Sequence, residues 1–206
     1  MKLDIFRVVN QTTFKRAIKF FVFLSIITVL TTLITYIVGL KLDITNIIYS
    51  IGSIKEISKV TGIHKVGAFI INNGFKAPLQ MMLLAIIPIQ FLYLLNVFIP
   101  SFIIGIAFGI VLQIDSVKGF QIIISSIPYS IVEVFAFCLL AAVLFELNQI
   151  VRGKIKNIFK KNKVKILFRS KVLEAIKIYA LLVLPMMVIA AFLETYVADI
   201  LFNLFQ

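Results

Sequence analysis

Long uncharged apolar runs alternate with short basic segments along this chain. The first run covers residues 20–40, with Lys15, Arg16 and Lys19 before it and Lys41 after it. At about 1.5 Å per residue, a helix of this length covers roughly 30 Å, which is the thickness of the hydrocarbon core of a bilayer. The run therefore predicts a membrane-spanning helix. It lacks a small-residue cleavage pattern at its end, which favours a retained anchor over a signal peptide.

A second uncharged stretch, residues 77–114, is nearly long enough for two spans. Asn96 and Pro100 interrupt it. The pattern predicts a tight helical hairpin with spans over 77–95 and 97–114. Proline is tolerated in the first turn of the second helix, because its missing N–H would have no helical partner there.

Two further runs complete the pattern. Residues 119–145 carry one charge, Glu133, and a proline at position 128. One long kinked helix is favoured, and a re-entrant helix over 119–127 followed by a shorter span is the alternative. Residues 178–198 form the last predicted span.

Between the first two runs, residues 41–76 are too polar to cross a membrane. Their apolar residues Ile44, Ile47, Ile48 and Ile51 have helical spacing, which indicates an amphipathic helix on the membrane surface. We therefore predict one all-α integral membrane domain over residues 1–206, with about five spans and surface amphipathic helices.

The composition agrees with a membrane protein, because 61% of the residues are hydrophobic and only 15% are charged. The net charge of +12 comes from basic residues that flank the spans. The positive-inside rule places the N-terminus and a basic loop, 146–177, in the cytoplasm of a bacterial cell, and the C-terminus outside. A nucleic-acid partner is not expected, because the basic residues lack interleaved stacking aromatics.

The basic loop alternates its cations with apolar residues, a pattern typical of helix lying on the inner leaflet. Anionic lipid is the favoured contact, and a cytoplasmic protein partner is the alternative. The predicted contact residues are Arg152, Lys154, Lys156, Lys160, Lys161, Lys163, Lys165, Arg169 and Lys171.

Glu133 is the main candidate for chemistry, because a carboxylate near the middle of a span is costly and usually faces the bundle interior. Ser126, Tyr129 and Ser130 share its helical face. Two interpretations remain open. The first is a protonated or hydrogen-bonded acid that fixes helix packing, and the second is a role in transport or signalling.

Other polar and small residues in the spans are weaker candidates. Glu194 follows small residues on the last span, and its predicted depth is nearer the outer interface than that of Glu133, so we do not expect the two acids to share a proton. The alternative is that Glu194 lies at the membrane interface and extends its carboxylate toward water.

Gly105 and Gly109 form a G-x-x-x-G pair, for which intramolecular helix packing is favoured over dimerisation.

The sequence lacks the motifs of several enzyme classes. There is no P-loop and no G-x-S-x-G sequence. His64 is the only histidine and Cys138 the only cysteine, which argues against a zinc protease or a multi-ligand metal site. We therefore expect no catalytic, cofactor-binding or metal-binding residues, and we expect that the protein is not an enzyme.

Three short segments resemble the stage II sporulation protein M family of bacterial membrane proteins. They are the pair Asn72-Asn73, the segment Pro128-Tyr-Ser-Ile-Val-Glu133, and Ala190-Ala191-Phe-Leu-Glu194. Family members tend to have histidine and glycine where this chain has Tyr129 and Ser130. The resemblance implies a non-catalytic role. Sporulation members localise peptidoglycan hydrolases, and others accompany circular bacteriocins in export or self-immunity with a separate ABC-type ATPase.

The leading hypothesis is thus a membrane scaffold or subunit of a cell-envelope complex, whose partners would include a wall hydrolase complex. The alternative is a subunit of a peptide export or immunity system. An intramembrane enzyme is the third and weakest reading. Whether the protein forms a homo-oligomer is left open by the sequence.

Overall fold

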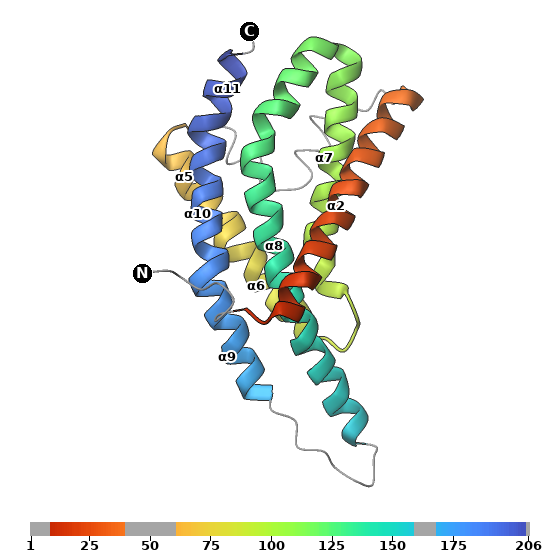
Figure 1. The fold of residues 1–206 in the computed structure, drawn as a ribbon, viewed down its shortest axis with the longest axis vertical. Helices are drawn as coiled ribbons and strands as arrows, with labels where there is room; N and C mark the ends of the chain where they lie inside the picture. Colours follow the sequence, from red (N-terminus) through yellow and green to blue (C-terminus); the bar gives the residue numbers. More distant parts are fainter. Residues whose placement is uncertain (1–8, 40–60, 159–167, 205–206) are drawn as a thin grey trace.

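The computed structural model describes residues 9–39, 61–158 and 168–204, except the side chains of residues 156–158. In these ranges every regular element is helical, and the helices form an elongated bundle (Figure 1). The predicted all-α class is therefore confirmed. The predicted amphipathic residues 44–51 lie outside the described ranges.

The first helix, α2, covers Gln11–Val38 and contains most of the predicted span 20–40. The side chain of Asn10 accepts a hydrogen bond from the Thr12 N–H (3.3 Å) and so caps the start of the helix. Gly39 ends the helix in the left-handed conformation (φ 67°), and its N–H donates to the Thr35 carbonyl. The helix thus begins well before the apolar run, because the basic residues ahead of the run are also good helix formers.

The second helix is displaced from its predicted position. It is a continuous sequence of α5 (Ile63–Phe69), the π-helical turn η1 (Ile70–Lys76) and α6 (Ala77–Ile86). The predicted span 77–95 is therefore wrong at both ends. Part of the segment 41–76, expected on the membrane surface, instead packs in the bundle beside α10.

A short turn follows Ile86 and leads through η2 (Leu92–Leu94) into α7 (Leu95–Ile114). The helix α7 agrees closely with the predicted span 97–114. The predicted break at Asn96 is wrong, because this residue lies in the first turn of α7. Pro100 lies inside the helix, and its ring faces outward.

The helix α8 runs from Ser116 to Ile158 and is the longest in the described part. Its start is capped by Asp115, whose side chain accepts hydrogen bonds from the N–H groups of Val117 and Lys118. It passes through Pro128 without interruption, so the single long helix is correct and the re-entrant alternative over 119–127 is not. It also continues past the predicted end at residue 145, which makes residues 146–158 helix and not loop.

The last helix is also longer than its predicted span of 178–198. It consists of α9 (Phe168–Ile178), η3 (Tyr179–Val183), α10 (Leu184–Phe192), η4 (Leu193–Val197) and α11 (Ala198–Leu204) in unbroken succession. The elements η3 and η4 are π-helical turns. Residues 146–158 and 168–177 of the predicted basic loop are therefore helical, and the remainder of it lies outside the described residues.

Four helices of the described part are long and apolar enough to cross a membrane: Gln11–Val38, Leu92–Ile114, Ser116–Ile155 and Phe168–Leu204. The helix Ile63–Ile86 is not among them, since it carries Lys65, Asn72, Asn73 and Lys76. The protein is thus a polytopic helical membrane protein whose described residues hold four candidate spans, where the sequence predicts about five for the whole chain.

The helix α8 occupies the centre of the bundle and contacts α2, α6, α7 and the α9–α11 helix (Figure 1). Residues 136–144 of α8 are all buried. Several of them are alanines, namely Ala136, Ala141 and Ala142, and small residues allow helices to approach closely without a hydrophobic driving force from water. Cys138 is a free buried thiol in this stretch.

The pair Gly105 and Gly109 packs against α2 within the same chain. A Cβ at Gly105 would lie 2.7 Å from the Thr28 carbonyl oxygen, and one at Gly109 would lie 2.6 Å from the Thr35 Cβ. The Thr28 hydroxyl also donates to the Ser101 carbonyl (3.2 Å), and the Gln113 amide donates to the Thr35 carbonyl. The close approach of α2 and α7 thus depends on small residues on α7 and threonines on α2.

A single methyl group at this contact should destabilise the bundle. Gly109→Ala would overlap both Thr35 and the Thr32 carbonyl, whereas Gly67→Ala, on α5, would meet no atom within 4 Å. We expect Gly109→Ala to cost about 1–3 kcal/mol and to lower the thermal unfolding midpoint in detergent. Gly67→Ala is the matched control and should leave the midpoint unchanged or raise it, because alanine is the better helix former. Equal midpoints for the two variants would contradict the tight contact.

Candidate functional site

Glu133, on α8, is bound by the second helix. The Asn73 side-chain amide donates a hydrogen bond to Glu133 Oε1 (2.8 Å), and the Asn72 amide donates to Asn73 Oδ1 (2.7 Å). All three side chains are partly buried. Both asparagines lie in the π-helical turn η1, so the predicted isolated acid has an amide partner from another helix.

Glu194, in η4, has a different partner. Its carboxylate lies 3.6 Å from the ammonium group of Lys65 on α5, and both side chains are mostly buried. The turn η4 packs against α8, the helix that carries Glu133 and Tyr129. Among the described residues no hydrogen bond joins the two acids directly. The structure thus brings Glu133, Glu194, Asn72, Asn73 and Tyr129 into one region, which we call the acid cluster.

The acid cluster coincides with π-helical turns, which often occur at functional sites because they interrupt the regular helical hydrogen bonds. Asn72 and Asn73 lie in η1, and Glu194 lies in η4. Tyr179, in η3, donates its hydroxyl hydrogen to the carbonyl of Gly74 in η1 (2.6 Å). The second and last helices are therefore connected by two polar contacts, one at Lys65 and one at Gly74.

The other predicted polar residues are used locally. Ser126 is buried and donates to the Ile123 carbonyl of its own helix (2.8 Å). Ser130 lies one turn before Glu133 on α8, on the predicted face. Asn96 is distant in the chain from this cluster, and its side-chain nitrogen is buried without a hydrogen-bond partner. Within the polar stripe predicted on α8, Glu133 thus bonds to another helix, whereas Ser126 bonds to its own helix.

A second polar cluster lies toward the end of the bundle where the basic residues gather, which we call the basic end. The carboxylate of Glu146 on α8 accepts hydrogen bonds from the Thr13 hydroxyl (2.7 Å), from Arg16 (3.2 Å) and from Lys171 (2.9 Å). Arg16 also donates to the Ala142 carbonyl, and Lys171 pairs with Glu174 at 2.7 Å. This cluster joins α2, α8 and α9, and the sequence patterns did not indicate it.

Four of the nine predicted lipid-contact residues have described side chains. Arg152 donates to the Gln90 side chain (2.8 Å), and Lys154 lies 4.8 Å from the centre of the Phe168 ring. Arg169 is exposed and Lys171 is bound to Glu146 and Glu174. The remaining ones lie outside the described residues or have undescribed side chains: Lys156, Lys160, Lys161, Lys163 and Lys165.

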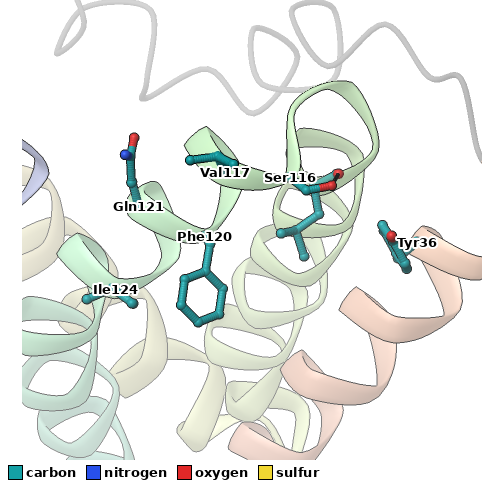
Figure 2. A pocket seen from close by; sticks show the side chains of 7 residues that line it. Tyr36, Ser116, Val117, Phe120, Gln121 and Ile124 are labelled. Carbon is teal, nitrogen blue, oxygen red and sulfur yellow. Dashed lines mark hydrogen bonds between the residues drawn. The ribbon is translucent and has the colours of Figure 1, made fainter. Parts of the chain in front are cut away.

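At the opposite end, an open hollow of about 570 Å³ lies where the end of α2 meets the turn between α7 and α8 (Figure 2). It is lined by Tyr36 from α2, Leu112 from α7, and α8 residues that include Phe120 and Ile124. The lining is mostly apolar and contains no charged side chain.

The described residues contain no group of three or more histidine, cysteine, aspartate or glutamate side chains that could hold a metal ion. The acid cluster offers one hydrogen-bonded acid–amide pair and one ion pair. Such an arrangement can hold helices together or respond to a proton.

The fold and these clusters define an all-helical polytopic membrane protein with polar contacts between its helices. The chain belongs to the stage II sporulation protein M family, whose model matches residues 17–199. This confirms the family that the sequence motifs indicated, and the match includes both acids of the acid cluster. Comparison with curated proteins and with solved structures gives no match.

If the Asn73–Glu133 contact stabilises the bundle, its two residues should be energetically coupled. We expect Asn73→Ala and Glu133→Ala each to lower stability, and the double variant to cost less than their sum. The coupling should be about 0.6–2 kcal/mol, the range for hydrogen bonds between membrane helices. Chemical unfolding in detergent micelles measures it. A cycle of Asn73→Ala with Glu146→Ala, which concerns two separate clusters, is the control and should be additive. If both cycles are additive, the Asn73–Glu133 hydrogen bond does not stabilise the bundle.

Proposed function

We propose that this protein is a non-catalytic membrane subunit or scaffold of a bacterial cell-envelope complex, of the kind that localises peptidoglycan hydrolases. Family membership supports a membrane protein related to sporulation proteins. The observation that favours a scaffold is the bonding of the intramembrane acids. Glu133 is held by Asn73 and Glu194 by Lys65, each from another helix.

Polar bonds between helices favour a rigid body because, inside a bilayer, a polar group that leaves its partner finds no water to replace it. A scaffold needs a fixed shape to hold its partners. It needs neither a nucleophile nor a nucleotide site. The proposal therefore assigns the polar residues to assembly of the bundle.

A subunit of a peptide export or self-immunity system is the second candidate. The packing of η4, which carries Glu194, against α8, which carries Glu133, favours it, as do the π-helical turns that hold Asn72, Asn73 and Glu194, because π-helical turns are frequent at functional sites. In that case a separate ABC-type ATPase would supply the energy.

We also propose that the basic end faces the cytoplasm, with the N-terminus inside and the C-terminus outside, and that the helix Ile63–Ile86 crosses the membrane as a fifth span. Its 24 residues would cover about 36 Å. Arg16, Lys171, Arg152 and Lys154 at one end agree with the positive-inside rule. Their position would allow contact with anionic lipid headgroups.

The scaffold role can be tested at Glu133. Glu133→Gln keeps the shape and a hydrogen-bonding group, so it should preserve both thermal stability and function in the host cell. Glu133→Leu removes the carboxyl oxygen that accepts the Asn73 hydrogen bond. The unpaired Asn73 amide should then lower the free energy of unfolding by about 1–3 kcal/mol and reduce the amount of folded protein. Melting temperatures in detergent and complementation of a deletion strain measure the two effects.

The pair of variants also separates the two candidates. If Glu133→Gln melts normally but abolishes function, the titratable proton itself is required, and the export or immunity subunit is the better explanation. If Glu133→Leu neither lowers stability nor impairs function, Glu133 has no role in assembly.

The topology can be tested with single cysteines introduced into a Cys138→Ala background. Lys154→Cys and Leu204→Cys place thiols at exposed positions near opposite ends of the bundle. A membrane-impermeant maleimide should label position 204 in intact cells and position 154 only after permeabilisation. The reverse pattern would show that the basic end faces outward.

A further inference from the structure

The second helix contains a backbone carbonyl whose regular helical donor is missing. In an α-helix the carbonyl of Gly74 would accept a hydrogen bond from the N–H of residue 78. Residue 78 is a proline, which has no N–H, and it is buried at the second position of α6. The Tyr179 hydroxyl donates to this carbonyl from the last helix (2.6 Å). A side chain of one helix thus replaces a backbone donor of another.

The backbone at Gly74 lies close to the last helix because this residue has no side chain. A Cβ atom here would lie 3.4 Å from the Leu184 Cδ1 atom and 3.8 Å from the Met187 Cβ atom, both on α10. Gly74 is buried. A buried carbonyl without a donor costs free energy, so the Tyr179 hydroxyl stabilises this arrangement.

The turn η1 that contains Gly74 is π-helical. At its end the Ala77 N–H donates to the carbonyl of Asn72, five residues earlier, where an α-helix would use the carbonyl four residues earlier. Turns of this kind are rare, because the α-helix is normally the more stable form of the backbone. Contacts from outside the helix must therefore hold η1 in its π-helical form, and the Tyr179 hydroxyl supplies one of them.

The form of η1 determines which way the residues before it face. A π-helical turn accommodates about one residue more than an α-helical turn. If η1 closed to a regular α-helix, the part before it would rotate by about 100° relative to the part after it. The helix α6 packs into the main core, whereas α5 packs into a smaller cluster beside α10, so α5 is the part that would turn. Lys65 would then face away from Glu194, and Asn73 would shift away from Glu133.

We propose that the Tyr179 hydroxyl and the Gly74 carbonyl form a latch on the second helix. While the latch is closed, η1 stays π-helical and both acids keep their partners from the second helix. When it opens, α5 rotates and releases both partners together. Pro78 belongs to the latch, because without its N–H the α-helical form cannot satisfy the Gly74 carbonyl. The latch goes beyond the proposed function, since it applies to a scaffold and to an export subunit alike.

The competing explanation is that the Tyr179 hydroxyl binds a nearby carbonyl and that η1 would keep its form without it. A buried tyrosine usually finds a hydrogen-bond partner wherever it lies. Here the partner is the one carbonyl that Pro78 deprives of its regular donor, and it directly follows Asn73 in a π-helical turn. The position of the bond therefore favours a role in holding the turn.

The rotation of α5 can be measured by the distance between spin labels, with double electron–electron resonance on the purified full-length protein in lipid nanodiscs. All labels are attached to cysteines in a Cys138→Ala background. One pair joins Ile63→Cys on α5 to Val29→Cys on α2, which lies across α8 (Figure 1). The reference pair joins Leu79→Cys on α6 to Val29→Cys. The three labelled positions are similarly exposed, at 60%, 57% and 59% for Ile63, Val29 and Leu79.

Two substitutions should open the latch by different routes. Tyr179→Phe removes the hydroxyl, and Pro78→Ala supplies the N–H that the α-helical form lacks. Each should raise the ratio of the rotated to the latched form about fivefold, the effect of one net hydrogen bond. The double variant should combine both factors and give a second distance for the α5 pair but not for the α6 pair. Tyr196→Phe, at an exposed position of the same helix, is the control and should change neither distance.

The hydrogen bond itself can be observed at the Gly74 carbonyl by nuclear magnetic resonance. Glycine labelled with carbon-13 at the carbonyl and phenylalanine labelled with nitrogen-15 give a correlated signal only from Gly-Phe pairs. The chain has two, at Gly74-Phe75 and Gly119-Phe120. Tyr179→Phe should move the Gly74 carbonyl signal upfield, because the carbonyl loses a donor. The Gly119 signal, from α8, is the internal control and should stay in place.

The other outcomes contradict the latch. If the double variant melts above the measuring temperature and keeps the wild-type distances, the bond does not hold η1. A second distance for both pairs would mean that the whole second helix moves, which excludes a rotation at η1. A Gly74 signal that stays in place in Tyr179→Phe would show that the hydroxyl does not bind this carbonyl. All measurements use the purified protein without a partner, so a failed latch leaves the proposed function standing.

Discussion

The carboxylate of Glu146 determines how three helices meet at the basic end of the bundle. It accepts hydrogen bonds from Arg16 on α2 and from Lys171 on α9, and without it Arg16 would lose this carboxylate partner. Its own helix, α8, makes further polar attachments. Glu133 binds the second helix, and Asn148 binds the turn that follows it. The neighbouring helices are thus attached to α8 at separate depths, and α8 sets their positions.

The sequence predicts the helical class and most apolar runs, but it does not predict where helices end. Hydropathy detects only the part of a helix that is suited to lipid, so α8 and the last helix both extend beyond their predicted spans into basic segments that favour helix equally well. The second helix shows that the sequence can also misplace the turn between two helices. Asn96 and Pro100 suggested a break that does not occur there. The real turn lies earlier, at Pro88, and its shape depends on Asn148 some sixty residues away.

The candidate site was predicted in part. Glu133 and Glu194 stand out in the sequence because charges are rare in apolar runs. The pair Asn72-Asn73 stands out through the family resemblance, but its bond to Glu133 does not, and Lys65 does not stand out because it lies in a segment whose lysines indicated a surface position. Glu146 was also missed, since an acid at the edge of a basic segment looks like an ordinary solvated residue. These pairs are long-range contacts, and spacing along one chain carries no direct signal for them.

The π-helical turns have a consequence for the comparison of related sequences. Each such turn accommodates about one more residue than an α-helical turn of the same length. A relative that lacks one residue between Leu193 and Val197 can close this turn to a regular α-helix, and the side chains before and after the turn then keep their faces. A deletion inside a regular α-helix would instead rotate one side by about 100° relative to the other. Single-residue gaps at these turns therefore leave the helix faces unchanged, and an alignment without them would pair residues that occupy different sides of the bundle.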